Sequence, residues 1–506
     1  MGIFGTGVER ICAVVAGTTA AEMARQVRLA LRETRTVELR LDWLHSDAER
    51  SRSLLWLRRK RLHSATFLAT CRRREGGGRF AGDVSRALYW LIQARGAGCK
   101  WCDLEVETLR KLPDKSIREY AVPPRVLLSV HDFERTPKLP RSMNPPARGE
   151  VDGVKIAAKS RSICDSIRLL RLARRSKNFV AVPMGEIGLP GRILALREGS
   201  ALAYAPVAEA TAPGQVSLSE LKHLYRAHQI TRRTRVYGVI GDPVGHSLSP
   251  LLHNTGFVAR HVDAVYLPFL VHQISDFLTA VPELGVRGFS VTLPHKQNIL
   301  KYLKECEPLA ADIGAVNTVV VRGDGSLYGC NTDYVGALRA LQKKLRLAGS
   351  RVLIFGAGGS ARAAAFALAR AGATVGICAR RERAAKELAR AAGGEVVPRR
   401  ALRTETFDAV LNSTPIGMHP NDGISPLSAG ELRCRVVMDL IYHPHKTQLL
   451  KIAAKKGIAT ISGAEMFLAQ GIAQWEIWME KRAPEALMRR AVFHALRAEE
   501  KSRQRG

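Results

Sequence analysis

Residues 351–367 read RVLIFGAGGSARAAAFA, and this stretch decides the fold of the C-terminal half of the chain. An apolar run leads into the Gly-rich turn GAGGSA, and an alanine-rich run that favours a helix follows it. A turn of the form GxGxxA between a strand and a helix lets backbone N–H groups approach a pyrophosphate at the helix N-terminus. A lone match is weak, but the strand and the helix that the turn requires are both present here. The sequence therefore predicts a Rossmann unit whose dinucleotide site includes Gly356, Ala357, Gly358, Gly359, Ser360 and Ala361.

The next predicted strand ends in CARRER, at residues 378–383. An enzyme that uses NAD places Asp or Glu at this strand end to bind the ribose 2′-hydroxyl, whereas a 2′-phosphate favours arginine. Arg380, Arg381 and Arg383 follow the strand instead, so the sequence predicts NADP as the cofactor. Thr414 and Gly463 complete the predicted cofactor-binding set.

Eight β-rich runs precede residue 215, with helix-period sequence in several of the gaps between them. Eight βα units in about 200–250 residues predict an α/β fold of the (β/α)8 TIM barrel type. A doubly wound open sheet is the alternative, but it usually has fewer strands. The runs lie at 11–16, 37–42, 66–71, 102–107, 125–130, 153–158, 179–184 and 201–206.

A polar break, TRRTR at 231–235, separates this region from a new strand–helix pattern that leads to the Rossmann unit. The new pattern predicts a two-part α/β unit, in which a substrate-binding domain precedes the dinucleotide-binding domain. We leave open whether the final helices pack back on the substrate-binding domain. In chain order, the barrel, the substrate-binding domain, the Rossmann domain and a basic C-terminal tail are predicted at 1–230, 236–340, 341–483 and 484–506.

The composition is that of a globular protein with an unusually positive charge of +32. The charge is spread evenly, with 40 Lys+Arg and 23 Asp+Glu in residues 1–230, so it argues for a basic surface and against a nucleic-acid partner. No apolar run approaches the length of about 20 residues that a membrane helix needs. Nine scattered cysteines fit a reducing cytoplasm, and the one CxxC pair, Cys99 and Cys102, has no second pair with which to bind a metal.

Polar residues stand at the ends of several predicted barrel strands, where barrel enzymes carry their functional groups. A buried polar group without a partner is costly, so such residues need a partner or a role. The candidates are Glu38, Arg40 and Asp42 after the second strand, Arg72 and Glu75 after the third, His131 after the fifth, Lys155 in the sixth, Arg192 after the seventh, and Thr211 and Gln215 after the eighth.

Lys155 lies in the apolar run GVKIAA and admits two interpretations. Burial favours the neutral amine of a lysine, which attacks a carbonyl to form a Schiff base. Alternatively, Lys155 is a structural lysine paired with Glu38 or Asp103, and on this residue alone the two interpretations are even. His131 favours catalysis because an imidazole moves protons near neutral pH.

Residues 9 to about 216 resemble type I 3-dehydroquinate dehydratase, because ELRLD, EGG, SVHDF, VKIA, MGEIGLPGR and APGQ occur in that family's order and spacing. The resemblance implies that Lys155 forms an imine with the substrate ketone, that His131 moves protons, and that Glu75 orients the histidine. It also implies chemistry without a metal, in which the substrate is bound by Glu38, Arg40, Arg72, Arg192, Thr211 and Gln215.

Two features depart from that family's pattern. Arg72 and Glu75 are three residues apart where the family commonly has four, so Arg73 or Arg74 could take part of the role of Arg72. Gly191 replaces a serine, and so does Thr211, which keeps a hydroxyl. These departures concern the substrate loops and not Lys155 or His131.

The second half carries another set of polar residues at predicted strand ends. Thr292 and Lys296 lie in VTLPHK, and a lysine paired with Asp333 could hold a proton near a carbonyl that accepts a hydride. Without further context, a surface salt bridge would be the preferred interpretation of such a pair. The remaining candidates are the hydroxyls of Ser247 and Ser249 in GDPVGHSLSP, and the amide of Asn317.

Residues 236 to about 483 resemble shikimate dehydrogenase throughout, in GDPVGHSLSP, VTLPHK, IGAVNTVV, NTDYVG, GAGGSARA, NSTPIGM, DLIYHP and MFLAQG. The resemblance implies that Lys296 and Asp333 form a coupled catalytic pair. It implies a weaker role for Asn331 and substrate binding by Ser247, Ser249, Thr292, Asn317 and Gln470.

The two resemblances together predict one chain that dehydrates 3-dehydroquinate and then reduces 3-dehydroshikimate to shikimate with NADPH. Catabolic oxidation of quinate or shikimate is a second interpretation, and a regulatory protein that senses these ligands is a third. The predicted partners are small-molecule substrates. The sequence leaves a homodimer open.

Overall fold

A computed structural model describes residues 9–112, 117–137, 151–176, 178–208, 214–245, 247–419 and 421–503. By its internal contacts the chain divides into two units. The first comprises Met1–Arg235 and Asp263–Gly285, and the second comprises Val236–Val262 and Val286–Gly506. The domain limits predicted from the sequence remain predictions.

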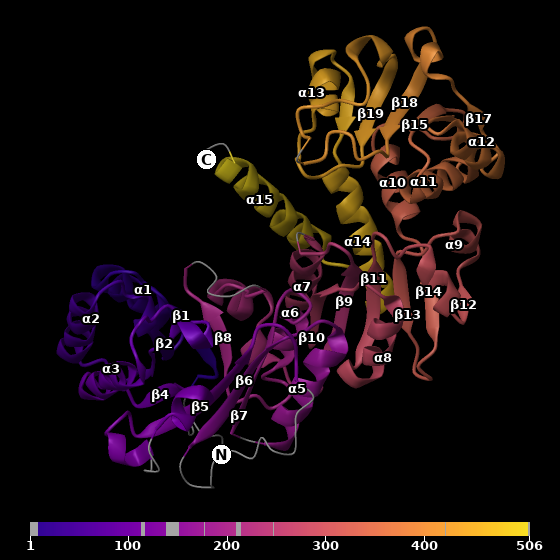
Figure 1. Cartoon of the computed structure of the whole chain (residues 1–506). Helices are drawn as coiled ribbons and strands as arrows, with labels where there is room; N and C mark the ends of the chain where they lie inside the picture. The colour runs from indigo at the N-terminus through magenta and orange to yellow at the C-terminus, as the bar shows by residue number, and fades with distance from the viewer. Residues whose placement is uncertain are drawn as a thin grey trace. The chain divides into compact units, whose positions relative to one another are not determined.

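Eight parallel strands form the first sheet (Figure 1), in the order β7-β6-β5-β4-β3-β2-β1-β8. The backbone N–H of Ala201, just before β8, donates a hydrogen bond of 2.8 Å to the carbonyl of Phe179 in β7, so the sheet nearly closes on itself. The predicted eight-stranded barrel is confirmed. Its strands are β1 (Ile11–Val15), β2 (Thr36–Arg40), β3 (Thr66–Thr70), β4 (Trp101–Glu105), β5 (Arg125–Asp132), β6 (Gly153–Lys159), β7 (Phe179–Met184) and β8 (Ala203–Pro206).

The helices of the barrel begin where the sequence supplies an N-cap. Thr19, Ser46 and Asp83 each accept a hydrogen bond from a backbone N–H of the first turn, which satisfies a donor that the helix itself leaves unpaired. The helices after β4 and β7 are short, and none lies between β5 and β6 among the residues that the structure describes. The barrel helices are α1 (Ala20–Glu33), α2 (Asp47–Lys60), α3 (Val84–Gly96), α4 (Val106–Arg110), α5 (Ile163–Arg175) and α6 (Leu189–Leu194).

An apolar plug fills one level of the barrel interior. Alternate strand residues point inward, so buried side chains of six strands meet there, together with Leu202 just before β8. The plug consists of Cys12, Val14, Leu68, Trp101, Leu127, Val180, Leu202 and Tyr204. Inward-facing residues further along the same strands are polar, and these begin the first candidate site.

Strand β10 (Ala264–Leu270) and helix α8 (Ile274–Leu284) group with the barrel, although the sequence analysis assigned them to the substrate-binding domain. Helix α8 packs on α5, and β10 packs near α6. Glu283 on α8 accepts hydrogen bonds from Arg171 at 2.9 Å and from Arg174 at 3.1 Å, both on α5. These contacts explain why the segment is counted with the first unit.

The second sheet has the order β10-β9-β11-β13-β14-β12. Strands β9 (Arg235–Gly241) and β11 (Val286–Val291) are parallel, whereas β13 (Thr318–Val321) runs antiparallel to both β11 and β14 (Leu327–Cys330). The two-residue strand β12 (Glu305–Cys306) pairs with β14 at the edge. Helices α7 (Ser249–Ala259), α9 (Pro308–Ile313) and α10 (Asp333–Gln342) belong to the same part of the chain.

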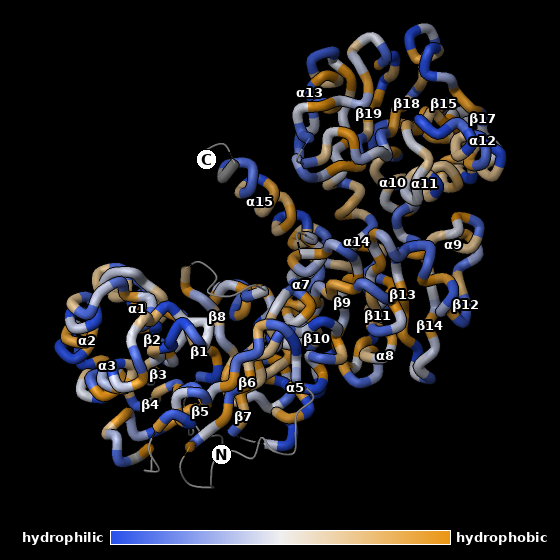
Figure 2. The backbone as a smooth tube through the Cα atoms, in the orientation of Figure 1, coloured by the Kyte–Doolittle hydropathy of each residue, from blue (hydrophilic) through white to orange (hydrophobic). Residues whose placement is uncertain are grey.

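The third sheet is parallel throughout, with the order β17-β16-β15-β18-β19-β20, and it contains the stretch quoted first. The predicted Rossmann unit is therefore confirmed. Figure 2 shows hydrophilic residues gathered on α12, at the outer margin of this sheet. The strands are β15 (Arg351–Phe355), β16 (Thr374–Cys378), β17 (Glu395–Val396), β18 (Phe407–Asn412), β19 (Cys434–Asp439) and β20 (Ala459–Ile461), and the helices are α11 (Gly359–Arg370), α12 (Glu382–Ala391) and α13 (Gln448–Lys455).

Two helices end the described chain. Helix α14 (Gly463–Met479) packs on α10 and α7, and α15 (Glu485–Arg503) packs on α7. The segment predicted as a basic tail is thus largely helical. Among the described helices, none has both the length and the apolar character needed to cross a membrane.

Candidate active sites

The first candidate site lies at the carboxyl ends of the barrel strands and centres on a buried ion pair. Lys155 on β6 contacts Asp103 on β4, and its side chain is only 5% exposed. Asp103 also accepts hydrogen bonds from Ser129 at 2.6 Å and from Arg72 at 3.2 Å. Burial alone would raise the pKa of the Asp103 carboxyl, but Lys155 and Arg72 outweigh it and hold that pKa below its ordinary value. Asp103 is therefore an anion shared by two cations.

Of the two carboxylates considered as partners for Lys155, the structure selects Asp103. Glu38 also points into the barrel, where its Oε1 accepts a hydrogen bond of 2.6 Å from Thr70. Arg40 is held by both oxygens of Asp42, at 2.9 and 2.8 Å. Glu38 and Arg40 are buried, so both belong to the polar lining of the barrel.

His131 lies at the end of β5, on the strand next to Lys155. In the sheet, His131 pairs with Ala157, which lies two positions beyond Lys155 along β6. The side chains of His131 and Lys155 therefore both lie on the inward face. Burial lowers the pKa of His131 well below 6.5, and the nearby cations Arg72 and Lys155 lower it further. The imidazole is therefore neutral near pH 7 and can accept a proton.

Glu75 does not lie where the resemblance implies. Its side chain is 65% exposed, and its carboxylate accepts hydrogen bonds from Arg73 at 2.8 Å and from Lys111 at 3.0 Å. The short spacing after Arg72 explains this, because a single helical turn at Arg74–Gly76 carries Glu75 outward. The role of orienting His131 is therefore not supported for Glu75 by its position.

A different carboxylate, Glu105, occupies the space beneath that turn. A Cβ added to Gly76 would lie 1.8 Å from Glu105 Oε1, so the turn packs directly against this side chain. Glu105 is buried, its Oε1 lacks a hydrogen-bond partner among the described residues, and it lies 3.9 Å from Arg72 Nε. Burial raises its pKa. The alternation in WCDLEVE is the signal that could have identified Glu105, since it places Asp103 and Glu105 on one face of β4.

The cationic side chains predicted to bind substrate are differently placed. Arg72 and Arg73 are buried, whereas Arg74 is exposed, so the first two are the candidates. Arg192 is buried and donates a hydrogen bond of 2.6 Å to the Pro183 carbonyl, while its Nη1 lacks a partner among the described residues. Burial lowers the Arg192 pKa to about 10.

Two more predicted residues of this site follow β8. Thr211 lies outside the described residues. Gln215 is described, lies just after the undescribed segment that contains Thr211, and is partly buried. Among the described residues, no group of three or more His, Cys, Asp or Glu is placed to hold a metal ion.

The second candidate site forms around Asp333, the first residue of α10. Lys296 donates a hydrogen bond of 2.6 Å to one carboxylate oxygen of Asp333, and Asn317 donates one of 2.8 Å to the other. Both oxygens are thus fixed by groups that approach from different loops. Asn331 is used by the backbone instead, because its side chain accepts from the Asp333 N–H and donates to the Ala315 carbonyl.

Helix α14 carries two glutamines into this site. The predicted residue Gln470 lies 3.5 Å from the Asn317 amide and donates a hydrogen bond of 2.9 Å to the Phe467 carbonyl. Gln474, which the sequence analysis missed, is buried and accepts a hydrogen bond of 2.9 Å from Ser290. Its amide donates to the Asn317 carbonyl at 3.1 Å. Gln474 therefore positions the backbone of Asn317.

The remaining predicted residues of this site are hydroxyls. Thr292 directly follows β11, four residues before Lys296. Ser247 accepts a hydrogen bond of 3.2 Å from the backbone N–H of Ser249, which begins α7. The structure thus joins Lys296, Asp333, Asn317 and Gln470 by direct contacts, and it places the two serines against each other.

The Gly-rich turn has the form that a pyrophosphate needs. Gly356 has φ +121°, and a Cβ there would lie 2.5 Å from Ser413 Oγ, so only glycine fits without strain. Gly358 and Gly359 face open space, where a ligand can approach the backbone at the start of α11. Ala361 is fully buried, so this position accepts no larger side chain without repacking. Ala357 and Ser360 complete the turn, both partly exposed.

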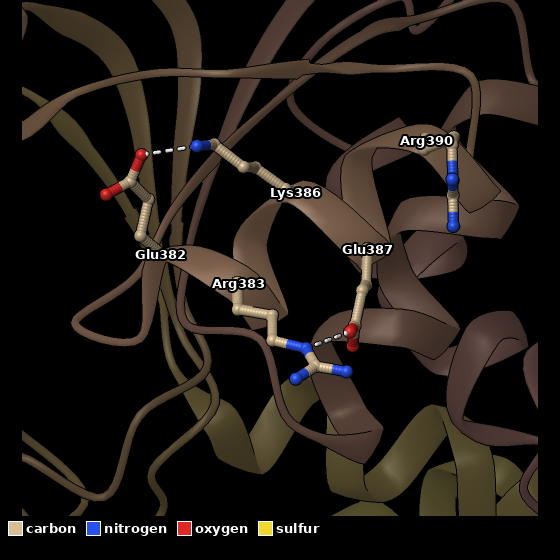
Figure 3. Close-up of a pocket in the computed structure, with 5 residues that line it drawn as sticks. All are labelled: Glu382, Arg383, Lys386, Glu387 and Arg390. Atoms are coloured by element: carbon tan, nitrogen blue, oxygen red, sulfur yellow. Dashed lines mark hydrogen bonds and ion pairs between the residues drawn. The ribbon is translucent and has the colours of Figure 1, made fainter.

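The three arginines after β16 differ in availability. Within the described chain, Arg380 and Arg381 are exposed, and their side chains have no hydrogen bond or ion pair. Arg383 lies one residue into α12, and Figure 3 shows it directed toward Glu387, to which it donates a hydrogen bond of 2.9 Å. Glu382 and Lys386 form a second pair on this helix. Arg380 and Arg381 are therefore the better candidates for a 2′-phosphate.

Thr414 and Gly463 have structural roles beside the predicted cofactor site. The Thr414 hydroxyl donates a hydrogen bond of 2.8 Å to the side-chain carbonyl of Asn412. A Cβ on Gly463 would lie 2.4 Å from the Leu440 carbonyl oxygen, so close packing explains this glycine.

Comparisons with known proteins follow the same division of the chain. Residues 11–232 match the model of type I 3-dehydroquinase, 239–319 that of the shikimate dehydrogenase substrate binding domain, and 463–493 that of the shikimate 5'-dehydrogenase C-terminal domain. A bifunctional 3-dehydroquinate dehydratase/shikimate dehydrogenase, chloroplastic, from Arabidopsis thaliana is 34% identical over 480 residues, which cover 89% of this chain and 78% of that protein.

This chain belongs to the bifunctional 3-dehydroquinate dehydratase/shikimate dehydrogenase family. Its barrel is a type I 3-dehydroquinase domain, and the shikimate dehydrogenase half follows it. The shikimate dehydrogenase (NADP(+)) of Methanosarcina acetivorans is 39% identical over 279 residues, 52% of this chain and 99% of its own. A solved shikimate dehydrogenase in complex with NADP+ is 37% identical and superposes with a TM-score of 0.50 over 53% of this chain and 98% of that one.

Replacing the two carboxylates beside the dehydratase site should distinguish their roles. Glu75→Gln should change the dehydratase kcat/KM by less than about twofold, since an exposed ion pair contributes little. Glu105→Gln should lower it about tenfold, because Arg72 loses a buried charged neighbour. Steady-state kinetics with 3-dehydroquinate measures both. A larger loss for Glu75→Gln than for Glu105→Gln would restore Glu75 to the role implied by the resemblance.

The dehydrogenase half carries a buried carboxylate, Asp439, that should make its stability depend on pH. Burial raises the Asp439 pKa from 3.8 to about 6, against the hydrogen bonds that it accepts from Thr447, Ile441 and Asn412. The folded state thus holds the proton more tightly than the unfolded state, and stability falls as pH rises from about 4 to 6. Asp439→Asn should remove this loss. It should raise the free energy of unfolding by up to about 3 kcal/mol at pH 8 and change it little at pH 4.

The matched control is Asp422→Asn, which removes a more exposed carboxylate of the same half. Melting temperatures of both variants and the wild type, recorded from about pH 4 to pH 8, test the prediction. If Asp439→Asn shifted the melting temperature equally at every pH, the Asp439 carboxylate would not be the source of the pH dependence of stability.

Proposed function

We propose that this chain catalyses two consecutive reactions: dehydration of 3-dehydroquinate to 3-dehydroshikimate through an imine on Lys155, and reduction of 3-dehydroshikimate to shikimate with NADPH. One observation carries the proposal. Each half contains a lysine in direct contact with a carboxylate at the centre of a polar cluster, Lys155 with Asp103 and Lys296 with Asp333.

In the dehydratase half, the chemistry begins with Lys155. Its amine must lose a proton to attack the ketone, and the carbon–nitrogen bond then forms as the carbonyl oxygen leaves as water. The resulting iminium withdraws electrons, so neutral His131 can remove a proton from the adjacent carbon while the substrate hydroxyl departs as a second water. Hydrolysis of the imine consumes one water and releases 3-dehydroshikimate, so the net reaction loses one water.

Cations around the barrel interior suit a carboxylate substrate. Arg192 has a buried nitrogen without a partner, which a substrate carboxylate would satisfy. Arg72, Arg40, Glu38 and Gln215 are proposed to bind the ring hydroxyls. Thr211 is retained in this set from the sequence.

In the dehydrogenase half, the Lys296–Asp333 pair holds the proton that the substrate carbonyl oxygen takes up. Asn317 fixes the second oxygen of Asp333, and Gln474 fixes the backbone of Asn317. The pair thus keeps one geometry while the proton is transferred, which is the preorganisation that acid–base catalysis needs. Ser247, Ser249, Thr292 and Gln470 are proposed to bind the substrate.

The open backbone at Gly358 and Gly359 and the unpaired Arg380 and Arg381 fit NADP(H). When bound, the reduced nicotinamide supplies the hydride. The relatives that carry NADP(+) in their names support this assignment.

Partners and location stay predictions. Small-molecule substrates are the partners we propose, and the even spread of charge gives no reason to propose nucleic acid. All nine cysteines are free thiols, in keeping with the proposed cytoplasmic location, although the plant relative is named as chloroplastic.

Removing each lysine should abolish one reaction and spare the other. Lys155→Ala should lower shikimate formation from 3-dehydroquinate and NADPH by about a thousandfold or more, while reduction of added 3-dehydroshikimate continues. Lys296→Ala should show the reverse, with a loss of about 10²–10⁴-fold in the reduction. Product analysis by mass spectrometry measures both. Borohydride added with 3-dehydroquinate should leave a reduced substrate adduct on Lys155. If the peptide that contains Lys155 carried no adduct, the imine assignment would be wrong.

The arginines after β16 should separate in their effect on cofactor choice. Arg380→Gln together with Arg381→Gln should raise the KM for NADPH at least about tenfold and leave the KM for NADH nearly unchanged, because a charge-assisted contact to the 2′-phosphate is lost. Arg383→Gln is the control, since Glu387 already engages that side chain. An equal effect of the control would assign the phosphate to α12 instead.

A further inference from the structure

Tyr204 lies inside the barrel, where the apolar plug meets the polar residues of the dehydratase site. Its ring belongs to the plug, and the residue is 9% exposed. The Lys155 amine lies 4.9 Å from the centre of that ring. Tyr204 therefore borders the atom that is proposed to attack the substrate.

The hydroxyl of Tyr204 has no hydrogen-bond partner among the described residues. The nearest acidic groups are already engaged, since Asp103 accepts from Lys155, Arg72 and Ser129, and Glu38 accepts from Thr70. A buried hydroxyl without a partner costs free energy that a phenylalanine at the same place would avoid. The hydroxyl is therefore a group whose partner is expected to arrive from outside the chain.

We propose that Tyr204 is a further catalytic residue of the dehydratase site, whose hydroxyl donates a hydrogen bond to the oxygen of the ketone that Lys155 attacks. The proposal rests on the imine mechanism proposed above. The reacting carbon must come to within about 3–3.5 Å of the lysine nitrogen, which brings its oxygen into the region that the Tyr204 ring borders.

The hydrogen bond would act while charge develops on that oxygen. As the carbon–nitrogen bond forms, the carbonyl electron pair moves onto oxygen, and a donor held in place stabilises it. The oxygen then takes up the two protons that the lysine nitrogen gives up, relayed by His131, and leaves as water. Tyr204 keeps its own proton throughout, so no group other than those already named is consumed.

The surroundings keep the phenol in its donor form. Burial raises the pKa of Tyr204 well above 10, and the neighbouring Cys12 and Glu38 raise it further. The hydroxyl therefore does not titrate between pH 6 and 9, and its contribution should be the same across that range. A general acid or base would instead change one limb of the pH profile.

The test is Tyr204→Phe in the full-length chain, with Tyr225→Phe as the matched control. Tyr225 is a second buried tyrosine of the same unit, outside the proposed site. The rate of imine formation is measured by rapid mixing with 3-dehydroquinate and quenching with borohydride, followed by mass analysis of the Lys155 peptide. Tyr204→Phe should slow imine formation about tenfold at every pH from 6 to 9, while Tyr225→Phe should not.

Two further measurements distinguish the proposed hydrogen bond of Tyr204 to the substrate from a purely structural role of this residue. Tyr204→Phe should melt at the wild-type temperature or above it, because the unpartnered hydroxyl is gone, and reduction of added 3-dehydroshikimate should be unchanged. Imine formation within twofold of wild type would overturn the proposal. A loss confined to one pH limb, or loss of the barrel's melting transition, would overturn it as well. If wild-type enzyme itself gives no adduct on Lys155, the imine mechanism fails, and that result is distinct from a failure of Tyr204.

Discussion

The barrel site depends on one constraint, which is that a lysine inside a barrel must face a carboxylate. Moving an ammonium group out of water is costly, and removing one partner of a buried ion pair is strongly destabilising because it leaves an uncompensated buried charge. Asp103 meets this requirement for Lys155 and Arg72 at once, and Ser129 completes its hydrogen bonds. Three neighbouring strands are thereby tied at one level, since Asp103 is on β4, Ser129 on β5 and Lys155 on β6. The pairing of these strands and the chemistry of the site thus rest on the same interaction.

The dehydrogenase site also contains a lysine paired with a carboxylate, and a chain of hydrogen bonds between neutral groups holds that carboxylate in place. Ser290 on β11 donates to Gln474, Gln474 donates to the Asn317 carbonyl, and the Asn317 amide donates to Asp333. The elements that carry these residues lie far apart in sequence, from β11 to α14. Helix α14 therefore acts as a support for the site, and the pair at Lys296 has its geometry set by hydrogen bonds rather than by burial alone. Because each link is neutral, the arrangement adds no charge to compete with Asp333.

The sequence was sufficient for the strands of the barrel, the Rossmann turn and the residues that follow strand ends, because these obey local periodicity and fixed spacing. It failed where an outcome depends on loop length or on neighbours from other strands. Losing one residue between Arg72 and Glu75 turned the glutamate outward and left Glu105 in the interior. Arg383 was predicted to bind the cofactor together with Arg380, but on the helix it is paired with Glu387 one turn away. The unpartnered hydroxyl of Tyr204 depends on which acceptors are already occupied, and no linear pattern records that.

The two lysine–carboxylate pairs differ in a way that matches the proton each reaction must move. The Lys155 side chain is 5% exposed, and its partner Asp103 is also held by Arg72, so the carboxylate pKa is low and Asp103 is a poor base. In the proposed imine mechanism, the proton that Lys155 must lose therefore has to pass to another group, for which we propose neutral His131. Lys296 is 20% exposed, and among the described residues the Asp333 carboxylate accepts its other hydrogen bond from the neutral amide of Asn317. In the proposed reduction, the Lys296–Asp333 pair only has to deliver one proton to the carbonyl oxygen of the substrate. This step requires no separate base. The same kind of contact therefore fits the imine chemistry proposed for one half and the proton delivery proposed for the other, because different groups touch the two carboxylates.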